Sequence, residues 1–284
     1  MINLDFTYNK YAEIIKAVSE SSYKPITIRD YIANSNLPEK FIIIRHDVDL
    51  DPSVQIKFAE LENSYGFKTS YYFRYIEKIY KKEIINKVFA LGHEVGYHYE
   101  VITKAKGDSE KAIEIFQDEL SHFQKNWNCV TVCPHGGSFL YDVDGYALKD
   151  IIKLIPKLVT KSSVFSSWNN FNLWSKYSFK DFRILGDAYK SIDFTNILYL
   201  SDTGRSWDNK FKRLDIVNSQ INPKFDIRNT DEIIDIIRNG SVDKIYLLVH
   251  FEQWKDNFID WLSWYAAQII RRTGKKIIFK MKRK

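Results

Sequence analysis

Short apolar runs alternate with amphipathic segments over most of the chain. Phe41–Ile44 and Tyr246–Val249 are rich in β-branched and aromatic residues, a pattern that predicts strands buried on both faces. Between Asp108 and Trp127 the apolar residues recur every three or four positions, which predicts a helix with one buried face. Repeated strand and helix units imply parallel strands with right-handed crossovers. We therefore predict an α/β fold, a single distorted (β/α) barrel of about seven parallel strands.

The predicted elements extend from Tyr8 to Ile270, and only the region between Tyr141 and Lys190 shows no clear period. The predicted strands are Phe41–Ile44, Lys68–Phe73, His93–Tyr99, Val130–Cys133, Ile197–Leu200 and Lys244–Val249. The predicted helices are Tyr8–Ser21, a helix from Pro52 to Gly66, Lys82–Leu91, Asp108–Trp127, Asp231–Asn239 with Thr230 as cap and Gly240 as stop, and Trp261–Ile270. We expect a connecting segment at Pro25–Leu37.

No linker and no internal repeat interrupts this pattern, so residues 1–284 are predicted to form a single domain. Residues 1–40 would be an N-terminal helical extension, residues 41–273 the barrel, and residues 274–284 a basic tail. With 284 residues, of which 45% are hydrophobic, the chain has enough apolar material for a substantial core.

The net charge of +6 leaves the partner open, because the basic residues are spread along the chain except at Lys275–Lys284. No recognition motif for DNA or RNA accompanies them, so we predict no nucleic-acid partner. The terminal basic run is expected to be a solvated tail, with peripheral contact to an anionic membrane surface as the alternative.

The longest apolar runs are strand-sized, far below the roughly 18 residues that a membrane-spanning helix needs, so no transmembrane segment is predicted. The first residues, Met1–Asp5, lack a basic segment followed by an apolar stretch, which favours a cytoplasmic location over secretion. Cys129 and Cys133 are the only cysteines, and in a reducing compartment we expect them to be packing residues.

Metal-capable side chains follow several predicted strands, and barrels of parallel strands gather their chemistry at the carboxyl ends of the strands. Five of the six histidines lie at strand ends or beside them. One such histidine is usually a hydrogen-bonded structural residue, but five together favour a metal site. Asp47 and Asp49 share strand parity, and two carboxylates facing the same space are costly without a cation between them. We predict a divalent metal ion, with zinc as the first choice for a carboxylate with imidazoles.

The order and spacing of these groups, from about Phe41 to Trp254, resemble the polysaccharide deacetylases of carbohydrate esterase family 4, which have the NodB-homology fold. Within that family the pattern resembles the WbmS-type deacetylase-like proteins, which are associated with bacterial surface-polysaccharide synthesis. The resemblance is carried by the stretches His46-Asp47-Val48-Asp49, Gly92 to His98, Pro134-His135-Gly136, Asp202 to Trp207, and Leu247 to His250.

The resemblance implies a role for each matching residue. Asp47 would be the general base and Asp49 a metal ligand. His98 would be a second metal ligand. His250, oriented by Asp202, would be the general acid.

Two positions depart from the family pattern. Ile102 stands where the family has a further metal-binding histidine, so we choose Glu100, on the strand parity of His98, as the third ligand. His93 and His135 are the alternatives. Val132 stands where the family has the arginine that orients the base, and Arg45, on the parity of Asp47, is expected to take over that role.

The function that the resemblance implies is a metal-dependent N-deacetylase acting on an N-acetylated sugar of a surface polysaccharide or its cytoplasmic precursor. Asp47 would take a proton from a metal-activated water, and His250 would protonate the departing amine. The metal, and a backbone N–H within residues 134–137, would stabilise the oxyanion. A catalytically inactive protein of the same fold, which binds a carbohydrate or serves as a scaffold, is the alternative that Ile102 and Val132 favour.

Aromatic and polar residues near the predicted site are candidates for contact with a sugar. Aromatic rings stack well on sugar rings, which points to the loop at residues 164–177, although packing beneath a long loop is the alternative there. The predicted substrate-binding residues are His135, Gly136, Arg205, Trp207, Trp254, Trp168 and Trp174.

Overall fold

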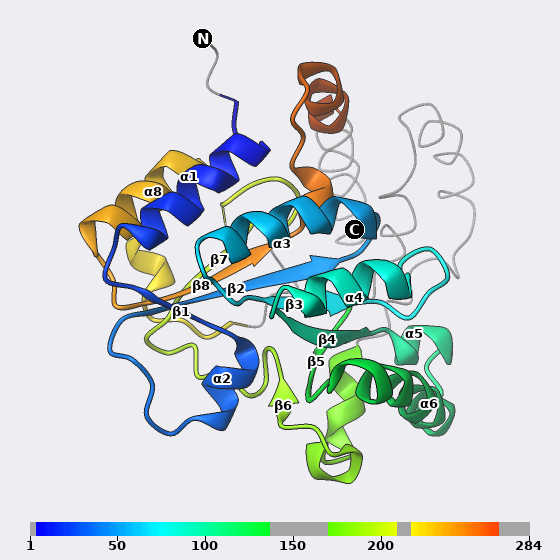
Figure 1. Cartoon of the computed structure of the whole chain (residues 1–284). Helices are drawn as coiled ribbons and strands as arrows, with labels where there is room; N and C mark the ends of the chain where they lie inside the picture. Colours follow the sequence, from blue (N-terminus) through cyan, green and yellow to red (C-terminus); the bar gives the residue numbers. More distant parts are fainter. Residues whose placement is uncertain (1–3, 137–169, 209–216, 267–284) are drawn as a thin grey trace, which may run out of the picture.

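The structure is a computed structural model that describes residues 4–136, 170–208 and 217–266. Its strands are β1 (Lys24–Ile26), β2 (Phe41–Val48), β3 (Ser70–Phe73), β4 (Glu94–Tyr99), β5 (Thr131–Pro134), β6 (Gly186–Asp187), β7 (Leu198–Ser201) and β8 (Lys244–Val249). Seven of them follow the order β6-β5-β4-β3-β2-β8-β7, and β1 pairs with β2 beside this path. All the pairings are parallel, and the sheet curls into a half-barrel flanked by helices (Figure 1). The predicted α/β fold, a distorted (β/α) barrel, is confirmed.

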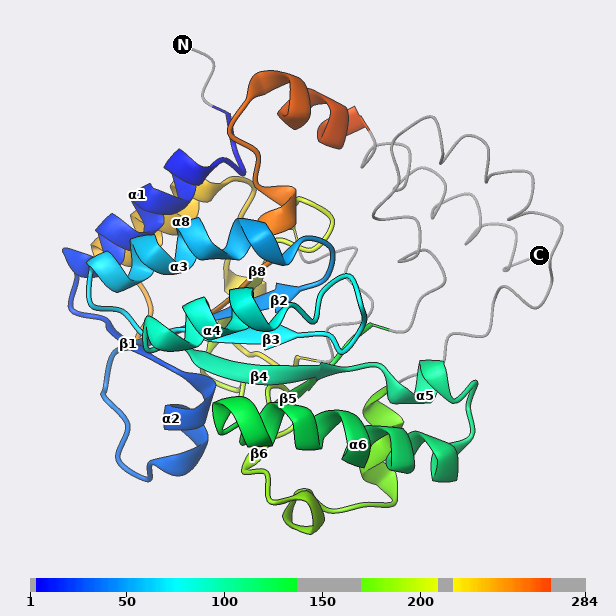
Figure 2. The ribbon, with the colours of Figure 1, turned by 45° about the vertical axis from the view of Figure 1, so that its right-hand side comes forward.

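Helices follow most of the strands, as right-handed crossovers between parallel strands require. They are α1 (Tyr8–Ser19), α2 (Ile28–Ala33), α3 (Gln55–Ser64), α4 (Lys82–Ala90), α5 (Val101–Lys104), α6 (Ser109–Trp127), α8 (Thr230–Asn239) and a helix over residues 258–266. The short 3-10 helices are Pro52–Val54, Asn170–Ser175, Phe179–Phe182, Asn222–Lys224 and Phe251–Gln253. Helices α1 and α8 lie side by side (Figures 1 and 2).

Strand β2 is buried along its whole length and separates two apolar layers. Ile42 and Ile44 pack in the cluster that also contains the buried side chains of α3, α4 and α6, so this is the helix-covered face. Phe41 and Ile43 point the other way, into the inner face of the half-barrel. Because side chains alternate along a strand, Asp47 belongs to the inner face and its neighbour in sequence belongs to the helix-covered face.

Most predicted elements are found within a few residues of their predicted bounds. Strand β8 coincides with its prediction, because a run of five buried apolar residues gives a clear signal. The predicted stop at Gly240 is confirmed by its left-handed backbone (φ +59°), which glycine adopts without strain. Thr230, predicted as the cap of α8, is instead its first residue, because the side chain of Asn229 caps the helix.

The N-terminal region was predicted as a helical extension outside the barrel, and this is wrong in one respect. Residues 24–26 form β1, which pairs in parallel with the first half of β2. The predicted connecting segment at Pro25–Leu37 contains the end of this strand and helix α2. A strand of three residues is too short to show a period, and Pro25 argues against a strand unless the strand lies at an edge.

Some predictions fall partly or wholly outside the described residues: the basic tail at residues 274–284, the end of the predicted helix Trp261–Ile270, and most of the region between Tyr141 and Lys190. Within the part of the chain that the structure describes, no helix is both long enough and apolar enough to cross a membrane.

Candidate metal centre

Titratable side chains meet at the carboxyl ends of five parallel strands, where the barrel architecture collects side chains from separate strands. Each comes from the last residues of a strand or from the residue that follows it. They are Asp47 in β2, Asp49 after β2, His98 in β4, His135 after β5, Asp202 after β7 and His250 after β8.

Asp49, His98 and His135 form a group with the geometry of a metal site. One ligand atom from each lies within 4.8 Å of the other two. Asp49 Oδ1 is 3.4 Å from His98 Nε2 and 3.5 Å from His135 Nε2. Ligands about 2.1 Å from a tetrahedral zinc ion are about 3.4 Å from one another, so these spacings fit a shared ion. These side chains are positioned to bind a metal ion.

The backbone fixes which nitrogen of His98 faces this group. His98 Nδ1 lies 3.1 Å from the carbonyl oxygen of Cys133. A carbonyl can only accept a hydrogen bond, so Nδ1 is the donor to Cys133 and Nε2 is the nitrogen that faces Asp49. A hydrogen bond of this kind on the remote nitrogen is what orients histidine ligands in metal proteins.

The electrostatics of the other two ligands also suit a cation. Burial lowers the pKa of His135 to about 4, so its imidazole is neutral and able to bind a metal at neutral pH. Burial alone would raise the pKa of Asp49, but the imidazoles of His135 and His98 lower it well below its usual value. Asp49 Oδ1 is itself buried and accepts no hydrogen bond from the described residues. A buried carboxylate oxygen without a donor is a costly arrangement that a bound cation would relieve.

Two residues that were not predicted as part of the site hold the backbone of Asp49. Glu252 Oε1 accepts hydrogen bonds from the N–H groups of Asp49 (2.8 Å) and Leu50 (3.0 Å). Arg74 donates from NH1 to the carbonyl of Asp49 at 3.0 Å. Arg74 directly follows β3, so the rule about the carboxyl ends of strands could have found it.

Glu100, predicted as the third ligand, lies near Nδ1 of His135, whereas Asp49 faces Nε2 of that ring. Arg74 donates to both of its carboxylate oxygens, at 2.7 and 3.3 Å, and His135 Nδ1 is 3.7 Å from Glu100 Oε2. The alternation of faces along β4 does not extend to Glu100, because the strand ends at Tyr99 and Glu100 has a non-extended backbone (ψ 32°). The structure brings His135 into the ligand group in place of Glu100.

His93, the other alternative, is on the opposite face of the sheet. Its Nε2 lies 3.0 Å from the carbonyl oxygen of Ala59 in α3. An odd number of positions separates His93 from His98, so the two imidazoles point to different faces of β4.

A second group of possible ligands, Asp47, His98 and Cys133, is less suited to a metal. Both carboxylate oxygens of Asp47 already accept hydrogen bonds from Arg45, at 2.8 Å from Nε and 2.5 Å from NH2. Burial raises the pKa of the Cys133 thiol well above its usual value, so it stays protonated and is a poor ligand. The group that contains Asp49 and His135 is therefore the better candidate.

The predicted pairing of Arg45 with Asp47 is present as a fully buried, two-point ion pair on the inner face. The guanidinium also donates to the hydroxyl of Tyr246 and lies 4.3 Å above the ring of Tyr189. Burial alone would raise the pKa of Asp47, but Arg45 reverses this effect and the pKa is lowered. Asp47 is thus ionised at neutral pH, with its orientation fixed.

His250 and Asp202 form a dyad at the ends of β8 and β7. His250 Nδ1 is 2.6 Å from Asp202 Oδ1. Asp202 Oδ2 accepts the backbone N–H of His250 and the indole N–H of Trp254. Burial opposes the charged imidazole, but Asp202 outweighs it and raises the pKa of His250 to about 10. A protonated imidazole is thereby held with its Nε2 3.9 Å from Asp49 Oδ2.

Three of the predicted substrate-binding residues have their contacts inside the protein. Trp207 is buried, stacks on Phe6 and donates to Thr230. Trp254 is also buried and orients Asp202. Arg205 donates to the backbone carbonyl of Trp261. These long side chains stabilise the fold around the site.

Of the remaining predicted substrate-binding residues, some are described by the structure and one is not. Trp174 packs edge-on against Phe116 and donates to the hydroxyl of Tyr99, which is the packing role considered as its alternative. Gly136 directly follows His135 at the end of a described segment. Trp168 lies outside the described residues, as does Gly137 of the expected oxyanion contact.

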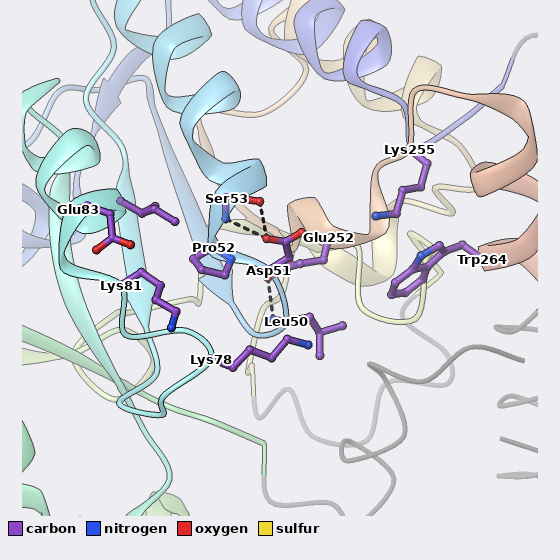
Figure 3. Close-up of a pocket in the computed structure, with 11 residues that line it drawn as sticks. Leu50, Asp51, Pro52, Ser53, Lys78, Lys81, Glu83, Glu252, Lys255 and Trp264 are labelled. Carbon is purple, nitrogen blue, oxygen red and sulfur yellow. Dashed lines mark hydrogen bonds between the residues drawn. The ribbon is translucent and has the colours of Figure 1, made fainter. Parts of the chain in front are cut away.

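A pocket of about 550 Å³ is lined by residues that follow Asp49 in the sequence and by Glu252, but by none of the three ligands. Leu50 and Asp51, which directly follow Asp49, form part of its lining, and so does Glu252. Figure 3 shows Lys78 and Lys81 on one side of Glu252 and Lys255 and Trp264 on the other. The lining residues are Leu50, Asp51, Pro52, Ser53, Lys78, Lys81, Glu83, Ile84, Glu252, Lys255 and Trp264.

The predicted residues that come together at one edge of the sheet are Arg45, Asp47, Asp49, His98, His135, Asp202 and His250. Arg74 and Glu252 complete the site, and neither was predicted. No family model, no curated protein and no solved structure matches the chain.

Proposed function

We propose that the chain is a metal-dependent N-deacetylase of the polysaccharide deacetylase type, in which Asp49, His98 and His135 hold the ion. The observation that carries this proposal is the placement of two further groups around the three ligands. An ionised carboxylate, Asp47, has Oδ2 3.6 Å from His98 Nε2, and a protonated imidazole, His250, reaches Asp49 from another strand. A base and an acid placed at one centre accelerate amide hydrolysis.

Zinc is the ion that we propose, because one carboxylate and two imidazoles with an open fourth position are typical of catalytic zinc sites. When bound, it would lower the pKa of a water molecule and polarise the acetyl carbonyl. With His135 as the third ligand, the set becomes one aspartate and two histidines despite Ile102. This is the ligand set that the resemblance to polysaccharide deacetylases implies.

The residues of the chain would move the protons. Asp47 accepts a proton from the water whose oxygen bonds to the acetyl carbon. The carbon–nitrogen bond then breaks, and His250 gives its proton to the departing nitrogen. The products are acetate and an amino sugar, and the substrate would be an N-acetylated sugar of a surface polysaccharide or its precursor.

The pocket lined by Leu50 and Glu252 is where we propose that the rest of the sugar binds. It is adjacent to Asp49 through Leu50 and Glu252, and Trp264 contributes an aromatic ring to its lining. Aromatic rings are suited to stacking on sugar rings, so Trp264 takes the role first expected of Trp168 and Trp174.

The test is acetate release from a panel of free, nucleotide-linked and lipid-linked N-acetylhexosamines by the zinc-loaded protein. Asp47→Asn should lower the rate by at least about 100-fold, because it removes the proton acceptor while preserving the shape of the side chain. His122→Asn, which alters a histidine on α6 outside the ligand group, is the control and should leave the rate unchanged. Absence of acetate from every compound would contradict the proposal.

A catalytically inactive carbohydrate-binding protein was the alternative based on Ile102 and Val132. Another residue substitutes for each of these two departures from the family pattern. His135 lies beside Asp49 in place of a ligand at Ile102, and Arg45 binds Asp47 in place of an arginine at Val132. These observations support the enzyme. A protein that binds one zinc ion and a sugar but releases no acetate would support the alternative.

A further inference from the structure

The helix over residues 258–266 has an unusually apolar exposed face. Seven large hydrophobic side chains are exposed in the described part of the chain, and four of them belong to this helix. With about 100° between successive helical residues, these four lie on one side of the helix. Their exposed fractions are Phe258 51%, Ile259 77%, Leu262 48% and Tyr265 47%.

Contacts of Trp261, which borders this face, tie the helix to the rest of the protein. The indole N–H of Trp261 donates to the carbonyl of Asp5 at 2.6 Å, and the carbonyl of Trp261 accepts from Arg205 at 2.9 Å. The ring of Trp261 is stacked between Phe258 and Tyr265, with centroid distances of 6.3 and 5.2 Å. The exposed rings are therefore fixed by the fold, and the helix lies outside the helices that cover the sheet (Figure 2).

The sequence after this helix indicates what covers the apolar face. Between positions 271 and 284 every charged residue is basic. They are Arg271, Arg272, Lys275, Lys276, Lys280, Lys282, Arg283 and Lys284. An apolar helical face combined with a basic segment is the pattern by which proteins bind the surface of an anionic bilayer.

We propose that the apolar face of helix 258–266 docks onto an anionic lipid bilayer, to which the basic segment adds electrostatic attraction. Ile259 and Leu262 enter the boundary between headgroups and acyl chains, and Trp261 stays on the protein side. Trp264, on the other side of the same helix, lines the pocket that includes Leu50 and Glu252 (Figure 3), so the docked helix would lie between this pocket and the membrane surface. The proposal does not depend on the deacetylase activity.

The test is co-sedimentation of the full chain with vesicles of phosphatidylcholine alone or mixed with phosphatidylglycerol. The wild type should sediment with the mixed vesicles only, and added salt should weaken its binding. The double variant Ile259→Ser, Leu262→Ser should lower the partition coefficient by at least about tenfold, because both apolar contacts are lost. The control is Leu185→Ser, which alters a 46% exposed leucine on another surface and should bind like the wild type.

Several results would overturn the proposal. Equal sedimentation of the double variant and the wild type would show that the face does not contact lipid. Absence of the wild type from the mixed-vesicle pellet would do the same. Sedimentation velocity without lipid tests whether a second copy of this chain covers the face instead. A wild-type dimer that is absent in the double variant would identify this second copy as the partner. Phe258→Ser is a milder variant that should lower binding without affecting the fold.

Discussion

Two buried clusters of carboxylates and histidines lie on opposite faces of β2, and they differ in how their hydrogen bonds are satisfied. The outer cluster, on the helix-covered face, surrounds Glu62 of α3. His46 Nε2 is 2.8 Å from Glu62 Oε1, which also accepts the hydroxyl of Tyr11. The hydroxyls of Thr69 and Tyr71 donate to Oε2 at 2.7 and 2.8 Å. Both oxygens of this carboxylate are saturated by protein donors.

The inner cluster consists of Asp47, Asp49, His98, His135 and His250, and its central carboxylate is arranged differently. The imidazole nitrogens around Asp49 are 3.4–3.9 Å from its oxygens, longer than ordinary hydrogen bonds. The spacing leaves room for an ion between them. The comparison teaches that residue types alone do not identify a metal site, since both clusters contain buried acids and histidines. What separates them is whether protein donors already satisfy the carboxylate.

Removal of Glu62 should have the largest effect on stability. Glu62→Ala leaves the buried partners of the outer cluster without their acceptor, so we expect the free energy of unfolding to fall by about 3–5 kcal/mol. Urea denaturation measures this loss. Glu60→Ala, on the exposed side of the same helix, should change stability by less than about 0.5 kcal/mol. If the two variants proved equally stable, the outer cluster would not be a structural support.

The pH dependence of unfolding should report the same cluster. Burial alone would raise the pKa of Glu62, but His46 and His93 outweigh it and lower the pKa to about 2. A lowered folded-state pKa stabilises the protein above the unfolded value of 4.5, and this contribution is lost as the pH falls from 4.5 toward 2. We expect a loss on the order of 3 kcal/mol, measured by denaturation across this range. Glu62→Gln should flatten the curve, and an unchanged slope would contradict the assignment.

His135→Ala should have its main effect on the inner cluster. Loss of a direct ligand should weaken zinc binding by more than about 100-fold, beyond the effect of changing an outer partner. Isothermal titration with zinc measures the affinity. His93→Ala, in the outer cluster, is the matched control and should keep the wild-type affinity. If His93→Ala weakened zinc binding and His135→Ala did not, the inner cluster would not be the metal site.

Glu100→Gln should have the smallest effect. Its carboxylate is bonded to Arg74 and lies 3.7 Å from His135 Nδ1, so it supports a ligand without being one. We expect zinc affinity to fall by about tenfold, while one ion per chain is retained. A complete loss of bound zinc in this variant would restore Glu100 as a direct ligand.

The fold was largely predictable from sequence, while the third ligand and the support of Asp49 by Glu252 were not. Runs such as Phe41–Ile44 identify strands because every position is apolar, and parallel strands imply where their carboxyl ends meet. Adjacent residues of β2 point to opposite faces, so the sequence already places His46 on the other face from Asp47 and outside the metal site. His135 follows β5, and its approach to Asp49 depends on how separate strands meet, which no local pattern contains.

The orientation of the His98 imidazole does not depend on which side chain stands at position 133. The acceptor is a main-chain oxygen, and His98 and Cys133 are direct partners in the pairing of β4 with β5. Replacing the thiol at position 133 would leave this acceptor in place. A single-residue insertion or deletion within β5 would slide a different carbonyl opposite the imidazole. The register of β5, more than the identity of its side chains, therefore determines which way the His98 imidazole faces.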